Sequence, residues 1–429
     1  MTIAGLDEAS LHSSLRDPLL GSLGFLNEVM DRYPDAISFA PGAPHPEFLT
    51  DLDVQRYIER FLDHLRGEGR TPERARRLLY EYGPGRGLIN DIVSDALRHD
   101  QEIEADPTAI VITVGAQEGM LLVLRALFRS GEDVLAVANP CFVGITGAAR
   151  LLDLECVAIG ETPAGIDLDA LATACREARR AGRRLRACYV APDFSNPGGS
   201  RMTLAARMEL LALAEREDFY VVEDNAYAFT AAGDAQLPPL KALDSGGRVI
   251  HIGTFAKVCF PGARVGYVVA DQRVGDTGRV LADELAAIKT VVTVNTSPLC
   301  QAVIAGMLLE HGRSLRELSR RKSELYQRNL HHLIGALDSC LGEVRSSRVS
   351  WNHPGGGFFV RMHLPVPADA DLLETSASRY GVLWTPMAQF YLGGGGEEQL
   401  RLSCSYLDID QIDAGVLRLA EFLKQEVGV

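Results

Sequence analysis

Short apolar segments that alternate with helix-like segments occupy the middle of the chain, from residue 109 to residue 270. Seven of the apolar segments have the length of a buried strand and lie at 110–114, 134–138, 156–159, 187–191, 219–223, 250–253 and 265–270. Segments with helical periodicity separate them. This alternation predicts an α/β fold with a mostly parallel, seven-stranded sheet between helices. In open sheets of this kind the ligand binds outside the carboxyl ends of the strands.

A second, smaller domain follows from the length of the chain, because 429 residues are more than one hydrophobic core usually supports. We expect an N-terminal arm with a substrate loop at 1–50, a large domain at 51–312 and a small α+β domain at 313–429. Further expectations are helices at 15–33, 88–99, 117–129, 204–217, 280–287, 298–310, 314–337, 369–379 and 409–426, an extended Pro/Gly-rich loop at 36–46, and apolar strand segments at 357–362, 382–385 and 400–404.

The charge balance and the cysteines argue against several classes of protein. A net charge of −14 disfavours a nucleic-acid partner, because phosphate backbones are bound by basic surfaces. The eight cysteines show neither CxxC pairs nor metal-ligand spacing, which predicts free thiols in a reducing compartment and no metal site. No segment approaches the roughly 20 apolar residues of a membrane span, and the N-terminus lacks the pattern of a secretion signal. We therefore expect a cytoplasmic protein without a membrane partner.

One loop between two predicted strands, at 254–264, carries Lys257 and Arg264 seven residues apart. A lysine close to buried strands loses hydration, which favours its neutral, nucleophilic amine and allows a Schiff base with an aldehyde. The planar guanidinium of Arg264 is always charged and suits a phosphate. An aldehyde and a phosphate on one ligand describe pyridoxal 5'-phosphate (PLP). For this loop alone, the alternative is a surface loop whose two cations are merely solvated.

The other strand ends carry groups that suit the same ligand. A helix that starts at Gly115 offers free N–H groups to a phosphate, and Phe142 has a flat face for a heteroaromatic ring. Asn196, before a Pro-Gly turn, and Tyr227 suit a phenolic oxygen. Asp224 suits a pyridine nitrogen, whose proton makes the ring an electron sink. Singly, these residues also fit a core aromatic, ordinary turn chemistry and a common strand-end carboxylate; together they fit one ligand.

Arg401 stands alone in an otherwise apolar strand segment of the small domain. An unpaired buried guanidinium is costly, so it has either a carboxylate partner within the protein or a role in binding a substrate carboxylate. The sequence leaves both alternatives open.

In order and spacing, these motifs resemble those of the fold-type I PLP-dependent aminotransferases of class I/II, in the group of the aminoadipate and kynurenine aminotransferases. The resemblance extends from about residue 37 to residue 401. It implies that Lys257 is the Schiff-base lysine, which also moves the proton between the substrate's α carbon and the cofactor. It further implies cofactor contacts by Gly115, Ala116, Gln117, Phe142, Asn196, Asp224, Tyr227, Thr254 and Arg264, with Asp224 and Tyr227 also in catalysis, and substrate contacts by Gly42, Asn196 and Arg401.

The resemblance also implies a homodimer with shared active sites, because Tyr82 matches a tyrosine that reaches the phosphate of the neighbouring subunit. Four positions depart from the usual pattern. Ala256 and Thr254 replace serines, Phe142 stands where tyrosine is common, and Met387 stands where a Pro-Gly pair is usual. None of these changes removes a catalytic group, but they can reshape the pocket.

The implied activity is the transfer of an amino group between an L-amino acid and a 2-oxo acid. One alternative keeps PLP but changes the chemistry to that of a lyase, a cyclase or a β- or γ-substituting enzyme of natural-product biosynthesis. The altered positions Ala256 and Met387, and the pocket candidates His45 and Cys259, motivate it. Another alternative is a regulator that senses PLP or an amino acid, against which the absence of a basic helix-turn-helix segment speaks.

Overall fold

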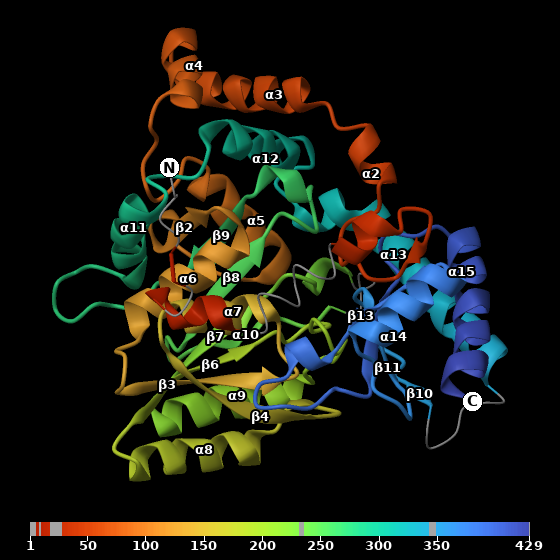
Figure 1. Ribbon diagram of the computed structural model, residues 1–429. Coiled ribbons are helices and arrows are strands. Elements are labelled where there is room, and N and C mark those ends of the chain that lie inside the picture. Colours follow the sequence, from red (N-terminus) through yellow and green to blue (C-terminus); the bar gives the residue numbers. More distant parts are fainter. Residues whose placement is uncertain (1–5, 8–9, 18–27, 231–235, 343–348, 429) are drawn as a thin grey trace, which may run out of the picture.

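The computed structural model describes residues 6–7, 10–17, 28–230, 236–342 and 349–428. Its main feature is an eight-stranded sheet in the order β2-β9-β8-β7-β6-β3-β4-β5 (Figure 1). The strands are β2 (Ile110–Thr113), β3 (Asp133–Asn139), β4 (Glu155–Thr162), β5 (Gly165–Ile166), β6 (Arg184–Val190), β7 (Tyr220–Asp224), β8 (Val249–Thr254) and β9 (Gly266–Val269).

All seven predicted strands are present, and the mostly parallel sheet is confirmed. Strands β3, β4, β6, β7 and β8 pair in parallel, whereas β9 runs antiparallel to both of its neighbours, β2 and β8. The eighth strand, β5, has only two residues and forms a short antiparallel hairpin with the end of β4. It was missed because a two-residue strand has no periodicity to detect.

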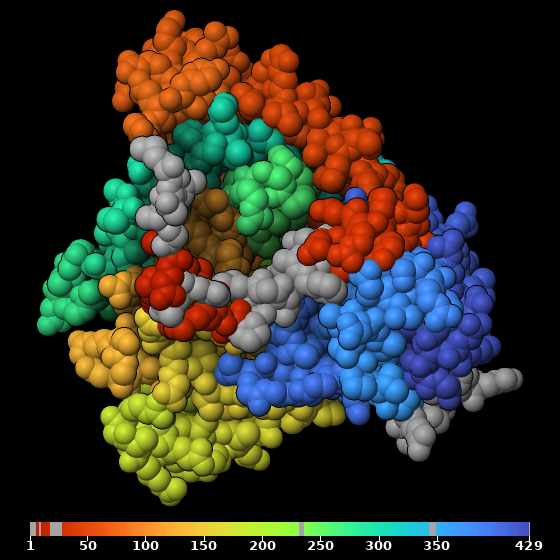
Figure 2. Space-filling model, viewed as in Figure 1, coloured from red at the N-terminus to blue at the C-terminus, as the bar shows by residue number. Residues whose placement is uncertain are grey.

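Helices cover both faces of this sheet. One face packs against α6 (Gly115–Leu127), α7 (Val143–Leu151) and α11 (Leu281–Val292). The other packs against α8 (Leu168–Arg180), α9 (Leu204–Glu217) and α10 (Leu240–Leu243) in one cluster, and against α5 (Asn90–Gln101) and α12 (Pro298–Glu310) in another. The helices α3 (Val54–Gly67) and α4 (Pro72–Tyr80) lie along the top edge in Figures 1 and 2.

Helices α9 and α12 have the bounds that the sequence predicts, and capping side chains explain where each of them begins. The Thr203 side chain accepts a hydrogen bond from the main chain of Ala206 and so starts α9. Ser297 does the same for α12, which continues with Pro298 at its first position. A cap satisfies main-chain N–H groups that lack a partner inside the helix.

A second core unites the C-terminal part of the chain with a piece of its N-terminal part. The four-stranded antiparallel sheet β10-β11-β14-β13 contains β10 (Ser350–Trp351), β11 (Phe359–His363), β13 (Thr385–Pro386) and β14 (Gln399–Ser403). It packs against α13 (Leu315–Leu341), α14 (Ala370–Thr375) and α15 (Ile409–Phe422). The short strand β1 (Ile37–Ser38) pairs in parallel with β12 (Val382–Leu383) and joins the same core.

In the N-terminal arm, the predicted helix at 15–33 lies partly outside the described residues. Those described include the short 3-10 helix η2 (Ser13–Arg16) and a helical piece at 28–32, and α2 (Glu47–Thr50) follows the extended loop. None of the helices in the described ranges is long and apolar enough to cross a membrane. Figure 2 shows the blue C-terminal part of the chain lying directly beside the yellow part.

Candidate active site

A cavity of about 270 Å³ lies where the carboxyl ends of β6, β7 and β8, the start of α6 and strand β14 of the small sheet meet. It brings together most of the predicted site residues: Gly42, Ala116, Gln117, Phe142, Asn196, Asp224, Tyr227, Thr254, Lys257, Arg264 and Arg401. Four residues that were not predicted as site residues also line the cavity: Met120, Tyr189, Ala191 and Ala226. The earlier pocket candidates His45 and Cys259 are not among its lining residues.

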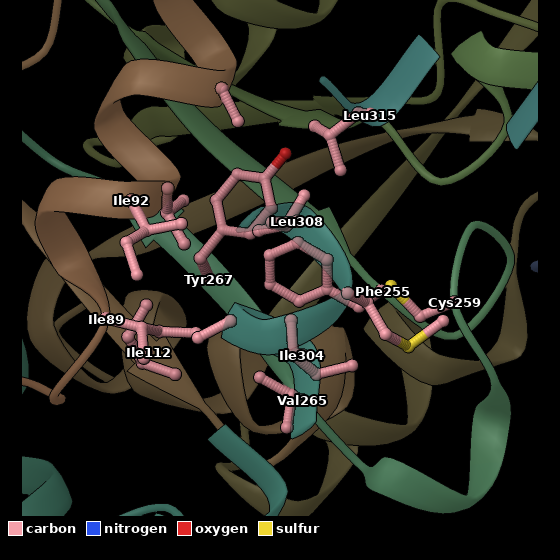
Figure 3. Packing of buried hydrophobic residues seen from close by; sticks show 14 of the residues in the cluster. Ile89, Ile92, Ile112, Phe255, Cys259, Val265, Tyr267, Ile304, Leu308 and Leu315 are labelled. Carbon is pink, nitrogen blue, oxygen red and sulfur yellow. The ribbon is translucent and has the colours of Figure 1, made fainter. Parts of the chain in front are cut away.

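Lys257 projects into the cavity from a tight turn directly after β8. The turn is closed by the main-chain N–H of Cys259, which donates to the carbonyl of Phe255 at 2.7 Å. Figure 3 shows Phe255 and Cys259 packed together in the core near Leu308 and Tyr267. Phe255, Val258 and Cys259 of the turn are anchored in the core, whereas Lys257 lines the cavity.

The amine of Lys257 is placed and electrostatically tuned by its surroundings. Its Nζ donates to the Gly42 carbonyl at 2.6 Å. The pKa of Lys257 is lowered to about 8, mainly by burial and also by the positive charges of Arg401 and Arg264, while Asp224 acts in the opposite direction. A larger fraction of neutral amine is therefore present near neutral pH than for an ordinary lysine.

A second lysine, Lys322 of α13, binds the main chain of the turn that carries Lys257. Its ammonium is buried and donates to the main-chain carbonyls of Val258 and Cys259, the latter at 2.6 Å. None of the ion pairs among the described residues gives Lys322 a carboxylate. The sequence offered no signal for this role, because Lys322 belongs to a charged helix that reads as exposed.

Asp224, the last residue of β7, is buried at the inner wall of the cavity. Its Oδ2 accepts a hydrogen bond of 2.6 Å from the hydroxyl of Tyr189, whereas its Oδ1 is buried without a partner. The pKa of Asp224 is raised to about 6, because the effect of burial outweighs the lowering by the Tyr189 hydrogen bond and by the charges of His251 and Lys257. The unpartnered oxygen is an acceptor that calls for an N–H donor on a ligand.

Arg401 of β14 reaches the cavity without an internal carboxylate partner in the described part of the chain. Its guanidinium donates to Asn196 Oδ1 at 2.6 Å, to the Ala40 carbonyl at 2.8 Å and to Thr385 Oγ1 at 3.2 Å. Its Nε is buried and unpartnered. Burial lowers the pKa of Arg401 to about 10, so the group remains charged at neutral pH. Of the two alternatives for Arg401, these contacts favour an external carboxylate.

Aromatic rings fix the position of Arg401 and of Tyr227. The guanidinium carbon of Arg401 lies 4.3 Å from the ring centroid of Phe359 and 5.2 Å from that of Phe390. Tyr227 packs edge-on against Phe359 with 5.7 Å between ring centroids. A Cβ on Gly42 would lie 2.7 Å from an atom of the Phe359 ring, so this close approach requires glycine.

Tyr227 is also linked to Asn196. Burial raises the pKa of the Tyr227 phenol, and a hydrogen bond from Asn196 works in the opposite direction. Asn196 therefore connects Arg401 with Tyr227. Because its pKa is raised, the Tyr227 hydroxyl stays protonated at neutral pH and can donate a hydrogen bond.

The opposite end of the cavity is formed by the start of α6 and by Arg264. Gly115 has a φ of 71°, and a Cβ there would lie 2.7 Å from Arg264 Nη2. No hydrogen bond or ion pair of the Arg264 guanidinium is found within the described residues. Ala116, Gln117 and Thr254 also line the cavity, and the Gln117 side-chain amide donates to the Gly144 carbonyl at 2.8 Å. A free guanidinium beside a helix N-terminus suits a phosphate.

The remaining predicted site residues lie at the edge of the cavity or away from it. Phe142 is the N-cap residue of α7 and lines the wall. Tyr82 does not line the cavity and is 89% exposed. Met387 is fully buried and does not line the cavity, so among the altered positions Ala256, Thr254 and Phe142 shape the wall.

Taken together, the donor and acceptor set fits PLP. The buried, unpartnered Oδ1 of Asp224 matches a protonated ring nitrogen, the unpaired Arg264 at the α6 N-terminus matches the phosphate, and the Lys257 amine matches the aldehyde.

Comparison with known proteins identifies the class. The chain belongs to the family described as aminotransferase class I and II, whose model matches residues 55–419. A solved multiple substrate aminotransferase from Thermococcus profundus superimposes with a TM-score of 0.80 at 28% identity over 95% of each chain. LysN, an α-aminoadipate aminotransferase from Thermus thermophilus in complex with a phosphopyridoxyl-leucine, does so with a TM-score of 0.76 at 29% identity, over 95% of this chain and 97% of its own.

Among characterised sequences, the (S)-3,5-dihydroxyphenylglycine transaminase of Amycolatopsis orientalis is 45% identical over 97% of this chain and 94% of its own length. The 2-aminoadipate transaminase of Thermus thermophilus is 32% identical over 91% of each. The chain is thus a fold-type I, PLP-dependent aminotransferase, as predicted. These relatives do not support the lyase or cyclase alternative.

Proposed function

We propose that the chain moves an amino group between an L-amino acid with an uncharged, aromatic side chain and a 2-oxo acid, with Lys257 carrying PLP as a Schiff base. The observation that carries this proposal is the desolvated Lys257 amine in one cavity with Asp224, Arg264 and Arg401. The name of the Amycolatopsis relative supports an aromatic substrate.

The charge of the cavity supports an uncharged substrate side chain. Four charged residues line it, namely Asp224, Lys257, Arg264 and Arg401. In the proposal each has a partner on the cofactor or on the substrate's α-carboxylate. No further cation among the described lining residues is left to pair with a second carboxylate. A dicarboxylic substrate would bury that charge unpaired, which is costly.

The proposed roles follow from the positions of the side chains. Bound PLP supplies an aldehyde carbon and a ring that withdraws electrons from the substrate's α carbon. Asp224 holds the proton on the ring nitrogen, and Tyr227 and Asn196 donate hydrogen bonds to the phenolic oxygen. Arg264 and the N–H groups of residues 115–117 hold the phosphate.

Lys257 and Arg401 act on the substrate. Arg401, together with Asn196 and the main chain at Gly42, binds the α-carboxylate and so fixes the α carbon next to Lys257 Nζ. When its amine is free, Lys257 takes the proton from the α carbon and returns it on the cofactor side. Its lowered pKa suits this task, because a general base must be neutral at the working pH.

We also propose a homodimer with shared active sites, in which Tyr82 contacts the phosphate of the partner's cofactor. Tyr82 is 89% exposed, and Val291, Val294 and Leu299 are exposed apolar side chains. The Tyr82 loop lies against the segment after α11, since a Cβ on Gly83 would be 3.7 Å from the Asn295 amide. Apolar side chains so exposed favour burial against a second copy.

The domain boundaries 1–50, 51–312 and 313–429 and a cytoplasmic location remain part of the proposal. Helix α13 begins in one large cluster of buried residues, at Leu315 and Leu318, and continues into the other from Leu330, so the passage from one core to the other falls within α13, close to the proposed boundary at 312. The free cysteines support a reducing compartment.

The test is the visible absorption spectrum of the purified protein with bound PLP, recorded before and after addition of a panel of L-amino acids. Mass spectrometry then identifies the released cofactor and product. We expect aromatic L-amino acids to bleach the visible band while the amino form of the cofactor and a 2-oxo acid appear. Recovery of unchanged PLP with a different product would contradict the proposal in favour of a lyase or cyclase.

A Lys257→Ala variant tests the lysine in the same assay. Its turnover should fall at least about 10⁴-fold, because it loses both the attachment point and the base. The exposed Lys424→Ala is the matched control and should react as the wild type does. Normal turnover by Lys257→Ala would refute the role of Lys257.

A further inference from the structure

We propose that Tyr189 is a positioning residue for amino transfer: its hydroxyl holds one oxygen of Asp224 so that the other faces the ring nitrogen of PLP. This inference rests on the proposed role of Asp224. The Tyr189 hydroxyl lies 2.6 Å from Oδ2, and Oδ1 is the oxygen left buried and unpartnered. Both residues line the cavity.

The sheet fixes the point from which Tyr189 donates. Strands β6 and β7 are parallel neighbours, and Tyr189 pairs in register with Val222, two residues before Asp224. The Tyr189 ring is 2% exposed and belongs to the cluster of buried residues beneath α6. A ring packed in this way cannot rotate away from its hydrogen bond. Because a carboxylate is planar and rigid, fixing Oδ2 also fixes the direction of Oδ1.

The Tyr189 hydrogen bond also affects how a proton is distributed between Asp224 and the ring nitrogen of PLP. Burial favours the protonated form of Asp224, and the Tyr189 hydrogen bond favours the ionised form. The other groups whose charges bear on this carboxyl are Cys141 after β3, Glu223 on β7, Tyr227, His251 on β8 and Lys257. Cys141 and Tyr227 stay neutral near neutral pH because burial raises the pKa of each.

Without the Tyr189 hydroxyl, Asp224 becomes a stronger base. The proton between its Oδ1 and the ring nitrogen then moves toward the carboxylate. A ring nitrogen without its proton withdraws electrons less strongly, so the α proton of the substrate is removed more slowly. Binding of the substrate carboxylate at Arg401 is unaffected, because Arg401 shares no hydrogen bond with Tyr189.

The experiment uses Tyr189→Phe, which removes only the hydroxyl and keeps the packed ring. The protein is loaded with PLP labelled with ¹⁵N in the ring, and the ¹⁵N chemical shift is measured at neutral pH beside steady-state kinetics. We expect a smaller protonated fraction of the ring nitrogen than in the wild type. We also expect kcat to fall roughly tenfold to hundredfold, as for loss of a hydrogen bond to a charged group, with KM for the amino acid changed less than about twofold.

Two controls separate this role from a general loss of structure. Tyr267→Phe removes the hydroxyl of another buried tyrosine, on β9, that does not line the cavity, and should leave the ¹⁵N shift and kcat at wild-type values. The double variant Tyr189→Phe/Asp224→Asn should be no slower than Asp224→Asn alone, since Tyr189 acts through Asp224. Thermal unfolding reports whether each variant is folded.

The outcomes are distinguishable. A wild-type ¹⁵N shift and kcat in Tyr189→Phe, while Asp224→Asn is impaired, overturn the role of Tyr189 and leave the proposed function intact. An unprotonated ring nitrogen in the wild type itself overturns the proposed role of Asp224 and this inference with it.

Discussion

The two ends of the cavity differ in how many of their polar side-chain atoms have hydrogen-bond partners within the chain. At the end formed by β7 and β14, Asp224 and Arg401 are buried and hydrogen-bonded to protein groups, with one atom each left over. At the end formed by α6, Arg264 is exposed and its guanidinium has no hydrogen-bond or ion-pair partner within the described residues, and Tyr82, outside the cavity, is 89% exposed. Folding therefore sets the geometry of the first end. The other end needs a ligand to complete it and, in the proposed homodimer, a second copy of the chain as well.

The largest difference between the two ends is expected from Arg401→Met. This change removes the carboxylate partner and leaves Asn196 Oδ1 without its donor. Charge-assisted hydrogen bonds contribute about 1.5–3 kcal/mol each, so KM for the amino acid should rise about 100-fold. The affinity for PLP should hardly change. Steady-state kinetics and an absorption titration with PLP measure both quantities, and the exposed Arg418→Met serves as control.

Arg264→Met probes the opposite end and should give the reverse pattern. The affinity for PLP should fall roughly tenfold to thirtyfold, as for loss of one charge-assisted contact. At saturating PLP, KM for the amino acid should return close to the wild-type value. If Arg264→Met and Arg401→Met affected the same parameter, the division of the cavity into two ends would be wrong.

Tyr82→Phe tests the proposed homodimer, in which the effect of this change requires a second subunit. Loss of one hydrogen bond to the phosphate should weaken PLP binding about fivefold. Mixed dimers of Tyr82→Phe with Lys257→Ala chains provide the decisive measurement. Their active site with an intact Lys257 receives its Tyr82 from the other chain and should bind PLP with wild-type affinity. Weakened binding there would place Tyr82 at its own subunit's site instead.

The smallest effect expected is on the pH dependence of PLP capture. Only the neutral amine of Lys257 reacts with the aldehyde, so the rate should rise with pH and level off above the pKa of about 8. The charge of Arg401 lowers the pKa of Lys257. Arg401→Met should therefore move the midpoint of the pH profile upward. Stopped-flow absorption of the apo-protein mixed with PLP measures this midpoint, and a downward shift would contradict the assigned electrostatics.

The parts of the fold and site that sequence reasoning predicted are those encoded locally. Asp224 ends an apolar run and Lys257 follows one, so the sheet that these runs form brings both to the same edge. Capping residues such as Thr203 explain why the first residue of a helix could be predicted correctly.

The features that were missed depend on contacts between distant segments. Tyr189 reads as one more apolar residue of a buried strand, and only the register of β6 against β7 directs its hydroxyl to Asp224. Similarly, the rings around Arg401 come from β11 and from the segment after β13, and their approach depends on strand pairing. Sequence periodicity does not show which side chains of different strands come into contact.

Lys322, which binds the turn that carries Lys257, determines which positions near this turn can be substituted during evolution. Lys322 binds two carbonyl oxygens, which every amino acid possesses, rather than particular side chains of the turn. Positions 258 and 259 can therefore drift among apolar residues of similar volume without loss of the anchor. Position 322 has no such freedom, because an apolar replacement would leave both carbonyls buried without a donor.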